Sequence, residues 1–157
     1  LQSAELKAEI SERYGGDVEL MNLKHGIFDE AAVSVISQAT IAGIGRDAGL
    51  ELDRRRFRAN IFLETERNEP FLEDEWVGGT LLFGDGEMLP AVSVTMPDER
   101  CVMINLDPET AEKDARVMKS VARLNQNNAG VYATVVRCGT IRVRDSVSIL
   151  LEDATTL

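Results

Sequence analysis

The fold is decided by residues 80–95, which read TLLFGDGEMLPAVSVT. Two runs rich in apolar and β-branched residues, 80–83 and 87–95, flank Gly84-Asp85-Gly86. Short runs on either side of a glycine-rich turn predict two antiparallel strands joined as a hairpin. Four further segments of the same character are predicted as strands: 57–63, 100–106, 131–137 and 141–150, with turns at Pro97-Asp98 and Cys138-Gly139. These strands favour a closed or nearly closed β-barrel, because closure leaves no exposed sheet edge.

Length and composition indicate one folded domain. The chain has 157 residues, of which 44% are hydrophobic and 28% charged, and this size suits a single core. The most apolar stretch, 31–45, is interrupted by serine, glutamine and threonine, so no membrane span is predicted. With 17 basic against 27 acidic side chains and a net charge of −10, a nucleic acid is not an expected partner.

Three helices are predicted beside the strands. Residues 3–14 carry apolar side chains at four-residue spacing, residues 37–48 have Ser37 as N-cap and Gly49 just past their end, and residues 115–124 repeat the helical spacing. A weakly alternating strand is predicted at 18–23, with a turn at His25-Gly26. The fold class is therefore α+β.

The first candidate site is the run RRRFRAN at 54–60, the only dense positive cluster in this acidic chain. In a strand, the two-residue period places Arg56, Arg58 and Asn60 on one face, which suits a phosphate or carboxylate. The alternative is that these arginines pair with the acidic stretch 64–75 at the surface.

The second candidate is the start of the helix at 37–48. Unpaired backbone N–H groups and the helix dipole favour an anion there, and the Thr40 hydroxyl adds a donor. Plain capping by Ser37, without a ligand, is the simpler interpretation.

The third candidate is Cys101, which follows Arg100. A neighbouring guanidinium favours the thiolate, which serves as nucleophile, sulfur carrier or soft-metal ligand. The alternative is a small hydrophobic core residue. Two cysteines without a secretory signal indicate free thiols in a reducing, cytoplasmic compartment, although a Cys101–Cys138 disulfide is not excluded.

The sequence lacks the residues that zinc binding, Ser-His-Asp catalysis and Schiff-base chemistry require. His25 is the only histidine, so histidine-ligated zinc and Ser-His-Asp catalysis are not expected. A Schiff base with pyridoxal phosphate needs a desolvated lysine. This hypothesis ranks last, because all the lysines stand in polar sequence surroundings. They are Lys7, Lys24, Lys113 and Lys119.

Six short motifs, taken in order, resemble the MOSC domain, named after the C-terminal part of molybdenum cofactor sulfurase. The resemblance covers about residues 26 to 150 and is strongest to the amidoxime-reducing and sulfurase branch. The motifs are Phe28-Asp29, Arg55-Arg56-Phe57-Arg58-Ala59-Asn60, Glu73-Asp74-Glu75-Trp76-Val77-Gly78, Arg100-Cys101, Asp107-Pro108-Glu109-Thr110 and Gly130-Val131-Tyr132-Ala133.

The resemblance implies a MOSC-type antiparallel β-barrel with about three flanking helices that binds the molybdenum cofactor (molybdopterin) or handles sulfur destined for it. The family's cysteine, a molybdenum ligand in the amidoxime-reducing relatives and a persulfide carrier in sulfurases, falls on Cys101. Its cofactor-contacting arginine and asparagine fall on Arg58 and Asn60, and its hydroxyl residue falls on Thr40. Arg56 and Arg100 complete the expected cofactor-binding set.

Several positions depart from the family pattern. Ala59 replaces a proline, Gln38 and Ala39 replace a threonine-serine pair, Ala111 replaces a glycine, and Arg144 replaces the glycine of a Gly-Asp pair. Relatives in this branch also carry an N-terminal β region with lysine and serine contacts to the cofactor. Residues 1–25, a predicted helix and strand, are therefore interpreted as the remnant of a longer N-terminal region, and residues 26–151 as the MOSC domain.

Two functions follow as expectations. The first is a molybdenum-cofactor-binding domain that acts in sulfur transfer or small-molecule reduction through Cys101, with a redox or sulfur-donor protein as partner. The second is a non-catalytic or vestigial MOSC-fold binding module without cofactor. Association of two chains to complete the site is a further expectation.

Overall fold

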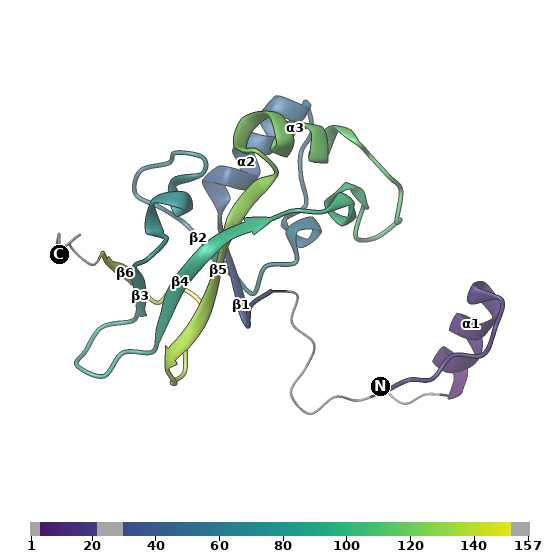
Figure 1. Ribbon diagram of the computed structural model, residues 1–157, viewed down its shortest axis with the longest axis horizontal. Helices are drawn as coiled ribbons and strands as arrows, with labels where there is room; N and C mark the ends of the chain where they lie inside the picture. Colours follow the sequence, from purple (N-terminus) through teal and green to yellow (C-terminus); the bar gives the residue numbers. More distant parts are fainter. Residues whose placement is uncertain (1–3, 22–29, 152–157) are drawn as a thin grey trace.

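The computed structural model describes residues 4–21 and 30–151. Helices and strands are mixed along the chain, which confirms the α+β class (Figure 1). With η for a 3₁₀ helix, the elements are α1 (Ala4–Tyr14), β1 (Val33–Ser37), α2 (Gln38–Ala48), η1 (Arg54–Phe57), β2 (Ile61–Leu63), η2 (Leu72–Trp76), β3 (Thr80–Phe83), β4 (Ala91–Glu99), η3 (Val102–Asn105), α3 (Arg116–Asn125), β5 (Asn128–Arg137) and β6 (Val147–Leu150).

The six strands form one sheet in the order β2-β1-β5-β4-β3-β6. It curls into a half-barrel around the long β4–β5 pair, with α2 and α3 beside one end (Figure 1). All neighbours are antiparallel except β1 and β2, which are parallel. Among the described residues β2 and β6 do not pair with each other, so the barrel stays open between them.

Two apolar clusters lie on opposite faces of the sheet. The alternation of side chains along β1 sends Val35 to one cluster and Ile36 to the other. The first fills the curl with residues from β1, β3, β4, β5 and η2: Val35, Trp76, Leu81, Phe83, Val92, Val94, Val131 and Ala133. The second lies under the helices: Ile36, Ile41, Ile44, Phe57, Ile104, Val117, Val121 and Ala129.

Local sequence signals predicted the ends of α2 and the pairing of β3 with β4. The Ser37 side chain accepts a hydrogen bond from Thr40 N at 3.0 Å, and Gly49 ends α2 at φ 66°, a left-handed conformation that glycine adopts without strain. β3 and β4 pair antiparallel as predicted, but β4 spans Ala91–Glu99 instead of 87–95, so the connection is longer than Gly84-Asp85-Gly86.

Three strand predictions need correction. Strand 57–63 begins only at Ile61, because η1 and a left-handed residue precede it. Segment 100–106 contains η3 instead of a strand. Segment 141–150 becomes a strand only at Val147, because Arg142 N donates to the Asp145 carboxylate at 2.7 Å and closes a turn.

The connections also differ from the prediction. β6 pairs with β3, so Cys138-Gly139 does not join two neighbouring strands. Pro97-Asp98 lies within β4 and is not a turn. β1, which sequence periodicity missed, runs directly into α2.

The N-terminal predictions have separate outcomes. α1 confirms the first helix, has no buried residue and lies apart from the sheet (Figure 1). Residues 18–21 form no strand, because no other strand pairs with them, and the rest of that predicted strand, His25-Gly26 and Phe28-Asp29 lie outside the described residues. No described helix is both long and apolar enough to cross a bilayer.

Candidate functional site

A cavity of about 540 Å³ opens where the start of β1, η1, the end of β4 and η3 meet, with one residue from β5. It brings Cys101 together with Arg58 and Asn60, which the sequence proposed from a different motif. Arg56 and Arg100 also line it. The remaining lining residues are Ala31, Ala32, Ser34, Phe57, Asp98, Glu99, Met103, Ile104 and Tyr132.

A tight turn, rather than a strand, brings Arg58 to the cavity. The Asp53 carboxylate accepts a hydrogen bond from Arg55 N at 2.8 Å, which begins η1. Arg58 ends η1 at φ 51°, where its backbone N donates to Arg55 O at 3.1 Å. This left-handed conformation is unusual for a residue other than glycine and occurs often at functional sites. Among the described residues none hydrogen-bonds or ion-pairs the Arg58 side chain, which is exposed.

The preceding arginines hold η1 in place. Arg55 forms ion pairs with Asp53 and Glu109, each at 2.6 Å, and its hydrogen bonds lower the pKa of Asp53 to about 2. The mostly buried Arg56 pairs with Asp107 at 2.8 Å and donates to Asn105 O at 3.0 Å. The terminal nitrogens of Arg56 therefore fasten η1 to η3 and the segment after it, and its role as a cofactor contact stays a prediction.

Asn60 presents a donor to the cavity. Its Oδ1 accepts from Ser34 N at 2.8 Å, while its own N donates to Ser34 O at 2.9 Å. These two bonds fix the side chain against β1. Because its oxygen is used, the amide Nδ2 is the group left to donate to a ligand.

Arg100 lines the cavity with a largely buried side chain. Its side chain is 8% exposed and pairs at 2.7 Å with Asp98, which is 1% exposed. The guanidinium also donates to Ala129 O at 2.7 Å and Phe57 O at 2.6 Å. Burial lowers the pKa of Arg100, and the charge of Asp98 opposes that shift. The nitrogens of Arg100 bind β4, β5 and η1 together beside Cys101, and its role as a ligand contact stays a prediction.

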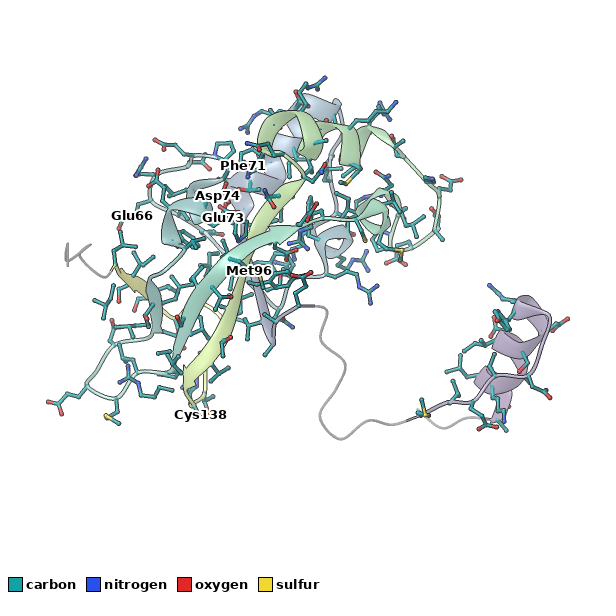
Figure 2. The ribbon with its side chains drawn as sticks, in the orientation of Figure 1. Glu66, Phe71, Glu73, Asp74, Met96 and Cys138 are labelled. Atoms are coloured by element: carbon teal, nitrogen blue, oxygen red, sulfur yellow. The ribbon has the colours of Figure 1, made fainter. Side chains whose placement is uncertain are left out.

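Cys101 is exposed and immediately precedes η3. The hypothesis of a buried core thiol is therefore wrong. The next two residues, Val102 and Met103, are exposed as well, and Met103 lines the cavity. Cys138 is also an exposed free cysteine, but it lies at the far tip of β5 and does not line the cavity (Figure 2).

Thr40 does not reach the cavity. It is fully buried, and its hydroxyl accepts a hydrogen bond from Phe71 N at 2.6 Å. The start of α2 is satisfied by Ser37 and packed against η2, where Glu73 accepts from Ser37 N at 3.2 Å. Plain capping is thus the correct interpretation of this helix start.

Sequence reasoning missed Ser34, Asp98, Met103 and Tyr132 as cavity residues. The Asp98-Glu99-Arg100 run offered a signal, because consecutive charged residues at the end of an apolar strand need a partner or solvent. Ser34 and Tyr132 gave none, since they reach the cavity only through the β1–β5 pairing, in which they are opposite each other.

A model of the MOSC domain family matches residues 22–148. The chain belongs to the MOSC domain family. This MOSC domain is also similar in fold to the crystal structure of the YuaD protein from Bacillus subtilis, with a TM-score of 0.60 and 17% identity over 78% of this chain. The match covers 65% of the YuaD chain, just under two thirds of its length. No curated protein sequence matches this MOSC domain significantly.

The donor set of the MOSC domain limits what the cavity can hold. The described residues contain no cluster of three or more histidine, cysteine, aspartate or glutamate side chains suited to a metal ion. Among the described residues that line the cavity there is no lysine, so none of them offers an amine for a Schiff base. Two carboxylates line the cavity, Asp98, which is paired with Arg100, and the exposed Glu99. Beside them the described lining offers the Cys101 thiol, the Arg58 guanidinium and the Asn60 amide, groups that suit an anionic ligand carrying a soft metal or sulfur.

Proposed function

We propose that this MOSC domain binds the molybdenum cofactor, with the Cys101 thiolate as molybdenum ligand and Arg58 and Asn60 as contacts for the phosphate and pterin. The observation that carries the proposal is the opening of Cys101 and Arg58 onto one cavity. Family membership supports the same assignment, because the MOSC family is associated with this cofactor.

The residues fit the group in size and chemistry. A cavity of about 540 Å³ is of the size that encloses a cofactor. A thiolate is a soft ligand, and an unpaired arginine recognises phosphate through charge-assisted hydrogen bonds. Arg58 is a local positive charge in a chain of net charge −10, and it attracts an anion to this cavity.

The chain's own residues position the thiol. Arg100 N donates to Asn127 O at 2.8 Å, and its guanidinium forms an ion pair with Asp98. Both the backbone and the side chain of the residue before Cys101 are therefore fixed. When bound, the cofactor supplies the redox chemistry for reduction of a small molecule. In sulfur transfer, the Cys101 thiolate attacks the terminal sulfur of a donor persulfide, and the donor leaves as its thiolate.

Cofactor loading tests the proposal. The wild-type chain and the variants Cys101→Ser, Arg58→Ala and Cys138→Ser are purified from a cofactor-competent host, and molybdenum and pterin are measured by metal analysis and fluorescence. We expect wild type and Cys138→Ser to retain both, and Cys101→Ser and Arg58→Ala to lose them. Wild-type protein lacking metal and pterin under all loading conditions contradicts the proposal.

The second candidate function is a MOSC-fold module without cofactor. It is favoured by the burial of Thr40 outside the cavity and by the ion pairs of Arg56 and Arg100 with protein carboxylates, which occupy donors that a cofactor would need. A persulfide donor followed by mass spectrometry separates the two functions. Preferential labelling of Cys101 over Cys138 supports sulfur handling, whereas equal labelling without cofactor supports the second candidate.

A further inference from the structure

A buried carboxylate, Asp98, lines the same cavity as the residues proposed to hold the ligand. Those residues, called the ligand residues below, are Cys101, Arg58 and Asn60. Asp98 Oδ2 accepts a hydrogen bond from Ser34 Oγ at 2.5 Å and lies 2.7 Å from Arg100 Nη2. A buried ion pair is a poor source of stability, because apolar residues of similar volume often stabilise a fold as well or better. The place of this pair beside the ligand residues therefore points to a role in the site.

The first connection from Asp98 runs through Arg100 to two of the ligand residues. The Arg100 guanidinium donates to Phe57 O at 2.6 Å, and this carbonyl belongs to the peptide group that leads into Arg58. The backbone of Arg100 leads directly into Cys101. The orientation of one guanidinium therefore sets the spacing between Arg58 and Cys101.

The second connection runs through Ser34 to the third ligand residue. The Ser34 hydroxyl donates to Asp98, and the Ser34 main chain forms two hydrogen bonds with Asn60. Ser34 N donates to Asn60 Oδ1 at 2.8 Å, and Asn60 N donates to Ser34 O at 2.9 Å. Asp98 thus reaches every ligand residue through at most two intermediate residues.

The sheet makes room for this arrangement. The β4–β5 ladder shifts register at Asp98, where residues 129 and 130 of β5 stand opposite a single residue of β4. Irregularities of this kind re-aim a side chain and are frequent next to active sites. Gly130 has φ 88°, and a Cβ on it would lie only 3.2 Å from Arg100 Nη2. Glycine at this position therefore leaves the space that the guanidinium takes.

We propose that Asp98 is a positioning residue, which holds the ligand residues at the spacing that one anionic ligand needs. The inference rests on the proposed function of the cavity. The Asp98 side chain is 1% exposed and offers almost no surface to a ligand, so it acts through Arg100 and Ser34. Groups that are already in place when a ligand arrives lower the cost of binding it.

The sign of the expected effect separates positioning from charge. A negative Asp98 repels an anion in the cavity, so removal of its charge strengthens the attraction for an anion if charge alone matters. If Asp98 positions the ligand residues, the same change weakens that attraction, because Arg58 no longer faces an anion that reaches Cys101. Asp98→Asn removes the charge and keeps the size of the side chain.

Alkylation of Cys101 by iodoacetate and by iodoacetamide tests the proposal in the cofactor-free full chain. Both reagents react with the thiolate and release iodide, so the ratio of their rates at one pH does not depend on the ionised fraction of the thiol. Only iodoacetate carries a carboxylate, which the Arg58 guanidinium attracts. Peptide mass spectrometry measures the ratio, and Cys138, which is exposed and does not line the cavity, serves as reference in the same molecule.

The variants have distinct expected ratios. At low ionic strength, Arg58→Met is expected to lower the iodoacetate-to-iodoacetamide ratio at Cys101 by about threefold, the effect of one charge about 6 Å away in water. Asp98→Asn is expected to lower it toward the same value, and Ser34→Ala part of the way. Val121→Ala is a control that opens the fully buried packing under α3, outside this network, and is expected to keep the wild-type ratio. The ratio at Cys138 is expected to stay constant in all variants.

Two results overturn the proposal. One is a ratio at Cys101 that stays unchanged or rises in Asp98→Asn that is folded by circular dichroism. The other is a wild-type ratio equal to that of Arg58→Met. If Asp98→Asn does not fold, the ratio of Ser34→Ala decides in the same way. Molybdenum loading of the wild type is measured separately, so a chain that shows the expected ratios but binds no molybdenum refutes the proposed function and supports the positioning role of Asp98.

Discussion

Replacing Arg100 with methionine tests the clamp under the cavity. The substitution keeps the apolar stem but leaves the Asp98 carboxylate, 1% exposed, without the guanidinium at 2.7 Å. Removing one partner of a buried ion pair costs about 3–5 kcal/mol, because an uncompensated charge stays in the interior. The carbonyls of Ala129 and Phe57 also lose a donor each. We therefore expect Arg100→Met to lower the free energy of unfolding by about 4 kcal/mol.

Urea unfolding followed by circular dichroism measures this effect. A matched control is Arg116→Met, because the Arg116–Asp114 pair has the similar distance of 2.6 Å but an exposed arginine. The control is expected to leave the unfolding midpoint nearly unchanged, since solvent screens an exposed pair.

The double variant Asp98→Asn with Arg100→Met isolates the charge. It removes the buried anion together with its partner, so it is expected to be more stable than Arg100→Met alone. The reasoning is refuted if Arg100→Met costs less than about 1 kcal/mol, the range of a surface pair. It is equally refuted if adding Asp98→Asn makes the protein less stable still.

Three further substitutions have definite outcomes. Burial raises the pKa of Asp74 (Figure 2), so its charge opposes folding at neutral pH. Asp74→Asn should therefore be more stable than the wild type in urea titrations at pH 7, and this difference should vanish below pH 3.8. Hydrogen bonds from Arg55 lower the pKa of Asp53 to about 2, so this carboxylate stabilises the fold above pH 3.8 and its contribution fades toward pH 2. In an acid titration, Asp53→Asn should therefore lose less unfolding free energy between pH 3.8 and pH 2 than the wild type does. Gly130 has φ 88°, and a Cβ added there would lie only 2.6 Å from Val35 O, so Gly130→Ala should lower the thermal midpoint and cost at least about 2 kcal/mol.

The parts of the fold that could be predicted are those with local signals. Ser37 and Gly49 mark the ends of α2 by hydrogen bonds and backbone conformations that involve only their neighbours. The glycines at 84 and 86 likewise mark the connection between β3 and β4, although β4 begins only at Ala91. The β1 strand could not be recognised in this way, because it is buried, five residues long and continuous with α2, so no turn separates the two patterns.

In the candidate site, only the exposed residues could be predicted from the sequence. Arg58 and Cys101 stand out by residue type, and the cavity joins them. Arg56 and Arg100 look equivalent to Arg58 in sequence, yet apart from Asp98, which is close to Arg100 in the chain, the partners named above lie 29–51 residues away. Which arginine is left for a ligand is decided by tertiary contacts, and no local pattern carries that information.

The central claim is that Cys101 and Arg58 bind one molybdenum-containing ligand. Anomalous diffraction at the molybdenum edge, from crystals of the cofactor-loaded chain, tests it most directly. The proposal predicts one molybdenum peak bonded to Cys101 Sγ, with the anionic group of the same ligand at Arg58. A peak at Cys138, or ordered crystals of loaded protein with no molybdenum in the Cys101 cavity, would contradict it.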